Sequence, residues 1–259
     1  MPETSWTIRF EGYLPVDEGM EERLKRICAD IEKIPTSAME IDEEARTITI
    51  DCAQVKDWVK SSQDAICTIR AGEHFVVKPP WGDYQPQTGD VVLEIDPGTS
   101  FGSGLHESTR LCLRALEKRA KPDQVAVDFG TGTGILAIAA AKLGVSHVTA
   151  IEANPEAVEV ARANVKRNGL ESVIEVHHAL SPDFVREPVA LVTANITAET
   201  ITAHLDALVR ILKSGGILIA SGMTILNARD VERLLPNAGF STVEKLTDGQ
   251  WVALVAIKQ

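Results

Sequence analysis

An acidic residue followed by three glycines at alternate positions is the part of this sequence best suited to binding a ligand. Asp128 ends a short apolar run, and Gly130, Gly132 and Gly134 follow it before a stretch of strong helix formers begins at Leu136. Glycines allow a ligand to approach the backbone where any side chain would clash. The pattern predicts a strand, a tight turn and a helix that together bind a nucleotide-bearing ligand.

A second acid, Glu152, ends the next apolar run, 22 positions after Gly130. In nucleotide-binding folds of this type, a carboxylate at about this separation along the sequence binds the ribose hydroxyls. The dinucleotide fingerprint has its third glycine where this chain has Ile135, and the Gly-Lys-Ser/Thr sequence of a P-loop does not occur. Neither of these nucleotide sites therefore fits. A glycine turn that only connects a strand to a helix remains the simpler alternative.

The acid two residues before a G-x-G-x-G turn resembles the S-adenosylmethionine site of Rossmann-like methyltransferases. That ligand carries no phosphate. The resemblance therefore implies a turn that faces the amino-acid part of the cofactor, with Asp128 orienting that end.

Composition and charge limit the class of protein and its partners. A net charge of −11 over 259 residues argues against direct nucleic-acid binding and favours a small ligand or a basic protein partner. The four cysteines, Cys28, Cys52, Cys67 and Cys112, form no C-x-x-C pair, so we expect reduced thiols and no metal site. Because neither a signal-peptide pattern nor a long apolar run occurs, we expect a cytoplasmic monomer without membrane contact.

The elements that would position these residues fall into two predicted domains. Residues 1–53 are expected to form a small α+β (ferredoxin-like) domain with a strand at 6–10, a helix at 17–33 and a hairpin at 36–51. Residues 54–65 are expected to be a linker helix. Residues 66–259 are expected to form the catalytic domain, an α/β fold with a doubly wound sheet.

Within the catalytic domain, short apolar runs predict strands at 66–69, 75–77, 91–95 and 173–180, besides those that end at Asp128, Glu152 and Asn195. A helix is expected to begin near Glu107, and another to run from Ala198 to Leu212.

Charge is concentrated near the N-terminus. Residues 1–64 contain 8 basic and 15 acidic residues, a net charge of −7. A solvated acidic surface is the ordinary interpretation, and a docking surface for a lysine-rich protein is the functional one. Charge alone leaves both open.

A second glycine-rich stretch, residues 96–109, indicates a family. It matches the D-P-G-x-x-F-G-T-G-x-H-x-T-T segment of the PrmA methyltransferases at Asp96, Pro97, Gly98, Phe101, Gly102, Gly104, His106 and Thr109. Ser103 and Ser108 stand where threonine is usual, and both keep a hydroxyl.

The resemblance to the PrmA family continues through about residues 90–259. The turn matches D-x-G-x-G-S-G-x-L-A-I-A with Thr133 in the serine place, and Glu152 stands where the family's D-I-D-P has its first aspartate. Residues 161–169 resemble A-x-x-N-A-x-x-N-G, and residues 194–196 match A-N-I. Residues 1–60 agree with the family only in layout.

The resemblance implies a class I S-adenosylmethionine-dependent methyltransferase of a basic protein, the eleventh of the large ribosomal subunit, modified on lysine side chains and its α-amine. Thr109, Gly130, Glu152 and Asn195 match the family's cofactor-binding positions. Phe101 and Gly102 would belong to a loop that covers the cofactor, and Leu180 would line the adenine pocket. The turn adds Asp128, Gly132 and Gly134 to the predicted cofactor-binding residues.

Asn195 is the predicted catalytic residue. A lysine amine, with a pKa of about 10.4, and an α-amine, with a pKa of about 8, must each lose a proton before attack. The Asn195 carboxamide oxygen would accept an amine hydrogen and direct the lone pair toward the methyl group. Alternatively, Asn195 caps the helix that follows. His106 is a further candidate proton acceptor, although a histidine beside a helix start is more often structural.

Other functions remain open at this stage. One is a related lysine methyltransferase with another protein target, or a small-molecule methyltransferase. A non-enzymatic alternative is a cofactor-dependent binding module or inactive scaffold. The pair His177 and His178 has no cysteine or carboxylate at a convincing ligand spacing, so we expect no metal there.

Overall fold

The computed structural model describes residues 20–32, 67–97, 104 and 106–259, and the chain divides into two compact units, Met1–Val59 and Lys60–Gln259. In the first unit, α1 spans Met20–Glu32, inside the predicted helix at 17–33. The predicted strand at 6–10, the hairpin at 36–51 and the linker helix at 54–65 lie outside the described residues. The ferredoxin-like arrangement and the domain boundaries therefore stay predictions.

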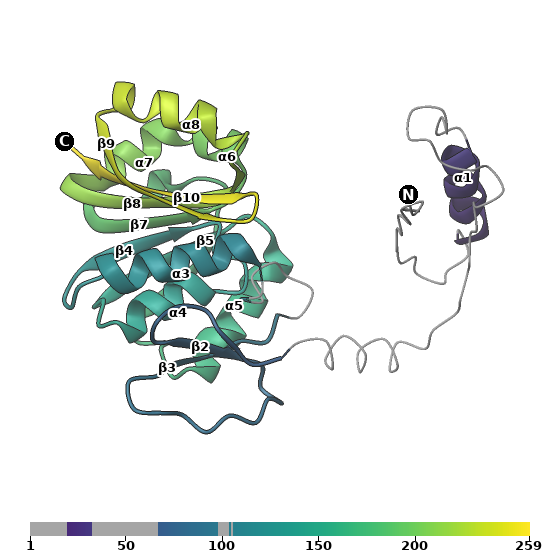
Figure 1. The fold of residues 1–259 in the computed structure, drawn as a ribbon, viewed down its shortest axis with the longest axis horizontal. Helices are drawn as coiled ribbons and strands as arrows, with labels where there is room; N and C mark the ends of the chain where they lie inside the picture. The colour runs from purple at the N-terminus through teal and green to yellow at the C-terminus, as the bar shows by residue number, and fades with distance from the viewer. Residues whose placement is uncertain (1–19, 33–66, 98–103, 105) are drawn as a thin grey trace, which may run out of the picture. The chain divides into compact units, whose positions relative to one another are not determined.

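The second unit is built on a seven-stranded mixed sheet (Figure 1). Its order is β6-β5-β4-β7-β8-β10-β9. The strands from β6 to β8 are parallel, and β10 runs antiparallel to both β8 and β9. Their bounds are β4 (Val125–Phe129), β5 (His147–Glu152), β6 (Ile174–His178), β7 (Val189–Asn195), β8 (Leu212–Thr224), β9 (Phe240–Asp248) and β10 (Trp251–Lys258).

Helices cover both faces of this sheet (Figure 1). One face carries α3 (Glu107–Arg119), α4 (Ile135–Lys142) and α5 (Pro155–Arg167), and the other carries α6 (Ala198–Ala203), α7 (Leu205–Ile211) and α8 (Ala228–Leu234). Because successive strand residues point to opposite faces, neighbours in β4 enter different cores. Ala126 packs with the first group of helices, and Val127 and Phe129 pack with the second. Two single 3₁₀ turns, Pro182–Phe184 and Pro236–Ala238, also lie in the described part of this unit.

A separate sheet of three strands precedes α3. It has the order β1-β2-β3, with β1 (Ile69–Arg70) antiparallel to β2 (Phe75–Lys78) and β2 parallel to β3 (Val91–Glu94). The strand predicted at 66–69 is thus shorter and later than expected. The strands predicted at 75–77 and 91–95 are confirmed within one residue at their ends.

One prediction needs correction, and one strand pairing was not predicted. The helix expected from Ala198 to Leu212 is wrong as a single element, because the backbone leaves the helical region at His204, with φ −106° and ψ 9°, and Leu212 already belongs to β8. The His204 ring lies edge-on to Phe129 at this break, with centroids 5.1 Å apart. The pairing of β10 with β8 and β9 was not predicted. Because β10 is antiparallel to both strands, the sheet is mixed.

The topology defines where a ligand binds. The chain passes from β4 to β5 and β6 on one side and then returns to β7 on the other side of β4. Open α/β sheets bind ligands at the carboxyl ends of their strands, where the strand order reverses. The ends of β4, β5 and β7 therefore form the expected site. Among the described helices, none is both long and apolar enough to cross a membrane.

Candidate functional site

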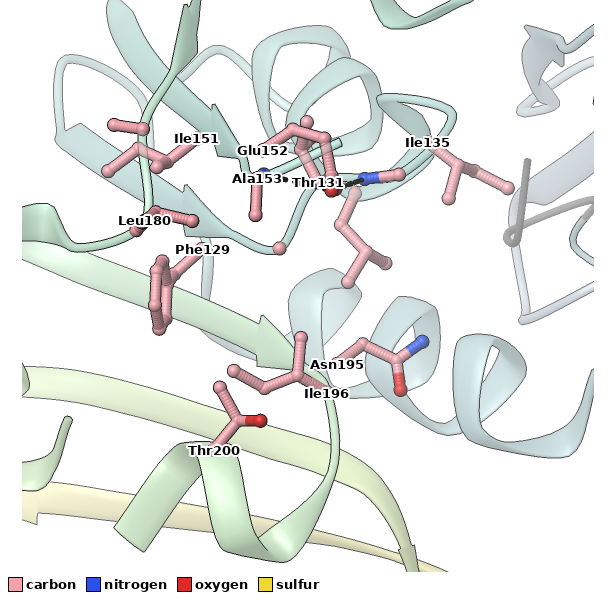
Figure 2. A pocket seen from close by; sticks show the side chains of 14 residues that line it. Phe129, Thr131, Ile135, Ile151, Glu152, Ala153, Leu180, Asn195, Ile196 and Thr200 are labelled. Atoms are coloured by element: carbon pink, nitrogen blue, oxygen red, sulfur yellow. Dashed lines mark hydrogen bonds between the residues drawn. The ribbon is translucent and has the colours of Figure 1, made fainter. Parts of the chain in front are cut away.

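A cavity of about 250 Å³ lies at the carboxyl ends of β4, β5 and β7 (Figure 2). Figure 2 shows Glu152 and Asn195 on opposite sides of it, with apolar side chains between them. Most of the lining is apolar, and the residues that form it are Phe129, Gly130, Thr131, Gly132, Ile135, Leu136, Ile151, Glu152, Ala153, Ala179, Leu180, Asn195, Ile196 and Thr200.

The glycine turn adopts a conformation that other residues resist. Gly130, Gly132 and Gly134 have φ values of 75°, 56° and 85°, in the left-handed region that glycine tolerates best. At Gly130 a Cβ atom would lie 2.2 Å from Cγ2 of Ile196. The backbone amides of Gly130 and Thr131 both donate to the Ile151 carbonyl at 2.9 Å, which ties the turn to β5. Contacts within the chain therefore fix the shape of the turn.

Asp128 lies beneath this turn and does not line the cavity. Its side chain is buried, and its carboxylate accepts hydrogen bonds from the Thr131 hydroxyl at 2.5 Å, the Thr193 hydroxyl at 2.6 Å and the Ala137 amide at 3.2 Å. Burial raises the pKa of the Asp128 carboxyl, and these hydrogen bonds oppose that rise. These contacts hold the turn from inside, and the expected role of Asp128 in orienting the cofactor stays a prediction.

Glu152 is half-buried at the end of β5, and its carboxylate is held by backbone amides. One oxygen accepts from the Gly132 amide at 2.9 Å, and the other accepts from the amides of Ala153 and Asn154 at 2.9 Å each. A carboxylate offers about four acceptor sites, so Glu152 keeps capacity for a further donor from the cavity. It is therefore placed to bind a ligand hydroxyl beside the turn.

Asn195 ends β7 and links the cavity to α3. Its amide nitrogen donates to the Thr109 hydroxyl at 3.2 Å, and its side-chain oxygen is buried without a hydrogen-bond partner in the part of the chain that the structure describes. An unsatisfied buried acceptor costs roughly 1–3 kcal/mol, which favours a role in ligand binding. Thr197 caps the next helix by accepting from the Thr200 amide, so the alternative role of Asn195 as a cap is excluded.

His106 lies at the start of α3, three residues before Thr109, and contacts Trp251. The His106 Nδ1 atom accepts from the Ser108 amide at 3.3 Å and thereby caps the start of α3. Its ring contacts Trp251 edge-on, with centroids 4.4 Å apart. These contacts support the structural interpretation of His106, and its role as a proton acceptor stays a prediction.

The predicted site residues separate into three groups. Those that line the cavity are Gly130, Gly132, Glu152, Leu180 and Asn195. Thr109 contacts the cavity only through Asn195, while Asp128 and Gly134 support the turn. Phe101 and Gly102 lie outside the described residues.

Sequence reasoning missed several lining residues. Ala153 and Ala179 follow the ends of β5 and β6, and Ile196 follows the end of β7. Their position directly after a predicted strand was the available signal. Thr200, one turn into α6, carried no comparable signal.

The neighbouring histidines His177 and His178 contact nearby protein groups. His178 Nε2 lies 3.0 Å from the Ala153 carbonyl, and His177 Nε2 lies 3.4 Å from Glu175. Across residues 20–32, 67–97, 104 and 106–259, no group of three or more His, Cys, Asp or Glu side chains could hold a metal ion. Cys28, Cys67 and Cys112 are free thiols.

Comparison with known proteins places these features in one family. The model of the family described as ribosomal protein L11 methyltransferase (PrmA) matches residues 4–259. A protein of that description from Pelotomaculum thermopropionicum is 39% identical over 251 residues, which cover 96% of this chain and 79% of the relative. Another, from Bacillus cytotoxicus, is 34% identical over 247 residues, which cover 95% and 78% of the two chains.

Solved structures agree with this similarity. The crystal structure of a ribosomal protein L11 methylase from Lactobacillus delbrueckii subsp. bulgaricus superposes with a TM-score of 0.70 at 31% identity, over 74% of this chain and 100% of that one. A putative RNA methyltransferase from Pyrococcus horikoshii, with a TM-score of 0.52 at 18% identity over 61% and 86% of the chains, shares the fold alone.

Proposed function

Because this chain belongs to the PrmA family of ribosomal protein L11 methyltransferases, we propose that it methylates lysine side chains and the N-terminal amine of that ribosomal protein with S-adenosylmethionine as the methyl donor. The observation that supports the chemistry best is the Asn195 oxygen, which is buried without a hydrogen-bond partner among the described residues and lies beside a glycine turn and a carboxylate.

The residues of the cavity fit S-adenosylmethionine. The backbone of Gly130 and Gly132 would leave room for the amino-acid part, whereas a side chain at Gly130 would collide with Ile196, which lines the same cavity. Glu152 retains acceptor capacity for the ribose hydroxyls. The apolar side chains of Ala179 and Leu180 would contact the adenine ring, with Leu180 closing over it from its exposed position.

When bound, S-adenosylmethionine supplies an activated methyl group on a sulfonium. The remaining work of the protein is to align a neutral amine with that methyl and to exclude water. Asn195 would do the first, because its free oxygen can accept an amine hydrogen while Thr109 fixes the amide nitrogen. The His106 ring, which contacts Trp251, lies at the start of α3 three residues before Thr109, and this ring pair would border the approaching amine.

Two experiments test this function. Incubation with labelled cofactor and ribosomal extract that lacks this methylation should label L11, and label on another protein would favour a different lysine methyltransferase.

In the second experiment, Asn195→Ala should still bind the cofactor, yet its turnover should fall about 100-fold because the amine is no longer aligned. The exposed Asn237 is a matched control, since Asn237→Ala should leave turnover unchanged. Near-normal turnover of Asn195→Ala would contradict the role of Asn195.

A further inference from the structure

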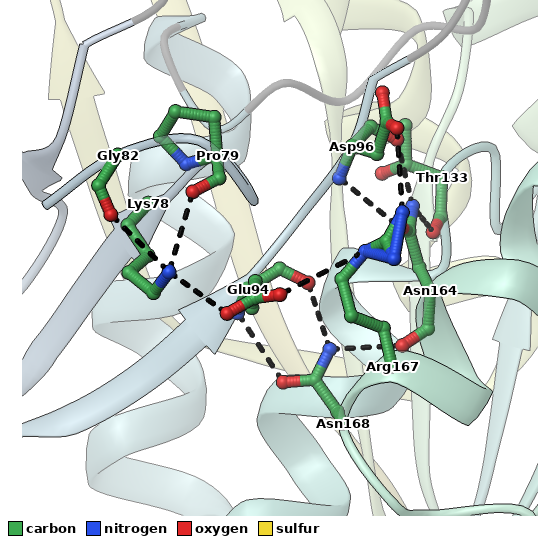
Figure 3. A network of polar contacts seen from close by, with 9 residues as sticks. All are labelled: Lys78, Pro79, Gly82, Glu94, Asp96, Thr133, Asn164, Arg167 and Asn168. Carbon is green, nitrogen blue, oxygen red and sulfur yellow. Dashed lines mark hydrogen bonds and ion pairs between the residues drawn. The ribbon is translucent and has the colours of Figure 1, made fainter.

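Asn164 of α5 and Asn168, which caps the C-terminal end of that helix, bind backbone groups through their side-chain amides (Figure 3). Those backbone groups belong to the last residue of β3 and to the residue two positions beyond it. Asn168 accepts from the Glu94 amide at 3.2 Å and donates to the Glu94 carbonyl at 2.8 Å. Asn164 accepts from the Asp96 amide and donates to the Asp96 carbonyl, both at 2.9 Å. Each carboxamide therefore bonds both the N–H and the C=O of one residue, as the backbone of an adjacent strand would.

The spacing of the two elements explains why both pairs form. Residues four apart on a helix are separated by about 6 Å along its axis. Residues two apart on a strand are separated by about 6.6 Å and present their amides to the same edge. β3 is the last strand of the three-stranded sheet, and Ile95 between the two paired residues donates instead to Lys78 of β2 at 2.9 Å. The asparagines thus satisfy the edge of β3 that β2 does not cover.

Ion pairs surround the two amide pairs. Lys78 lies 2.8 Å from Glu94, and Arg167 lies 3.4 Å from Asp96. These side chains are partly exposed, so they contribute less than the amides do.

Asn164 makes one contact that Asn168 lacks. It is fully buried, and its amide nitrogen also donates to the Thr133 carbonyl at 3.0 Å. Thr133 lies inside the glycine turn, between Gly132, which lines the cavity, and Gly134, which begins α4. The additional hydrogen bond of Asn168 goes only to the Asn164 carbonyl, within the same helix.

We propose that Asn164 is a positioning residue that fixes the glycine turn relative to the three-stranded sheet, so that cofactor affinity depends on it. This rests on the proposed function, because it takes S-adenosylmethionine as the ligand of the turn. Loss of the amide removes the Asn164 hydrogen bonds from three backbone groups, the amide and carbonyl of the partly buried Asp96 and the carbonyl of Thr133. The contacts that hold the turn from the strand side, those of Asp128, Glu152 and the Ile151 carbonyl, do not link it to the three-stranded sheet.

Asn168 provides the matched control. In the full chain, Asn164→Ala and Asn168→Ala should both lower the thermal unfolding midpoint, because each loses one amide pair with β3. Calorimetry with S-adenosylmethionine should show a Kd raised about tenfold or more for Asn164→Ala and nearly unchanged for Asn168→Ala. In turnover, Asn164→Ala should raise the KM for the cofactor while kcat at saturating cofactor stays near that of the wild type.

The outcomes separate this inference from the proposed function. Equal cofactor affinity in the two folded variants would overturn the positioning role. If Asn164→Ala does not fold, the cofactor affinity of Asn164→Ser, which keeps a smaller hydrogen-bonding group, is compared with that of Asn168→Ser. Equal affinities would again overturn the positioning role. The binding measurement uses cofactor alone, so a wild type that binds it without labelling L11 would contradict the proposed substrate and leave the Asn164 comparison intact.

Discussion

The two acids that flank the glycine turn have different surroundings, and these explain their different roles. Asp128 is buried and has three donors from its own chain, so its carboxylate stabilises the turn. Glu152 is partly exposed beside the cavity and is held only by backbone amides. The sequence pattern places both next to the turn, but it cannot distinguish them, because the distinction comes from hydroxyls of Thr131 and Thr193 on separate elements.

Gly130 provides a direct test of the close approach between the turn and the end of β7. Both Gly130 and Gly169 have positive φ, 75° and 67°, so alanine at either should destabilise the fold by roughly 1–2 kcal/mol. Only at Gly130 does the new Cβ meet another atom, Cγ2 of Ile196, whereas Gly169 has open space. Gly130→Ala should therefore displace Ile196 from the cavity and weaken cofactor binding more than tenfold, measured by calorimetry.

Gly169→Ala is the control for backbone strain in that comparison. It should show a similar loss of thermal stability with unchanged cofactor affinity. Equal affinities in the two variants would mean that the contact with Ile196 does not shape the cavity.

Among the elements, those with local signals were predicted and those formed by distant contacts were not. The strand, turn and helix from Val125 to Lys142 follow from apolar periodicity and glycine spacing, and they are confirmed. The start of α3 near Glu107 is confirmed as well. The pairing of β10 between β8 and β9 is a long-range choice that no local pattern specifies.

Glu117 shows the same limit for a single contact. Its carboxylate on α3 accepts hydrogen bonds from the amides of Glu73, His74 and Phe75, 42 to 44 positions away. A Cβ at Gly72 would lie 2.5 Å from that carboxylate. Such a contact fixes the small sheet against the helix, yet the sequence around either partner predicts only a turn and a charged helical face.

The loop between β2 and β3 should make the stability of the protein depend on pH. Asp90 accepts from the Tyr84 hydroxyl at 2.5 Å, the Gln87 amide at 2.8 Å and Arg70 at 2.7 Å, and these bonds, that of Tyr84 foremost, lower the pKa of its carboxyl to about 2. Because the unfolded value is near 3.8, the unfolded chain binds more protons between these pH values. The stabilisation is therefore complete above about pH 4 and is lost as the pH falls through 2.

Tyr84→Phe isolates this effect. The variant loses the largest contribution, so its Asp90 pKa should move back toward the unfolded value, and its unfolding midpoint should lie below that of the wild type near neutral pH. The difference should shrink as the pH falls from about 4 to 2 at constant ionic strength. In an Asp90→Asn background the shrinkage should disappear. A difference that stays constant with pH would refute the linkage.

At the scale of the whole molecule, the charge is distributed unevenly between the two ends of the chain. Residues 1–64 carry −7, which leaves −4 on the other 195 residues. The cavity with its glycine turn lies wholly in the unit Lys60–Gln259. The sequence predicts more individual residues for the cofactor site than for the substrate site. The glycine turn is a local motif, whereas substrate docking depends on a surface spread over many residues.

An acidic docking surface in the first 64 residues predicts that salt affects the two substrates differently. Attraction between exposed charges is screened over about 10 Å at 0.1 M ionic strength, so raising the salt from roughly 50 to 300 mM should raise the KM for L11 several-fold. In the proposed site the cofactor would bind by backbone groups and a held carboxylate inside a cavity, so its KM should change less than about twofold. Replacing Asp42, Glu43 and Glu44 with their amides should reduce the salt dependence for L11, because it removes three of the 15 acidic charges that would attract a basic protein. If the KM for L11 is independent of salt, or rises in parallel with that for the cofactor, the acidic residues are a solvated surface and the protein substrate is recognised elsewhere.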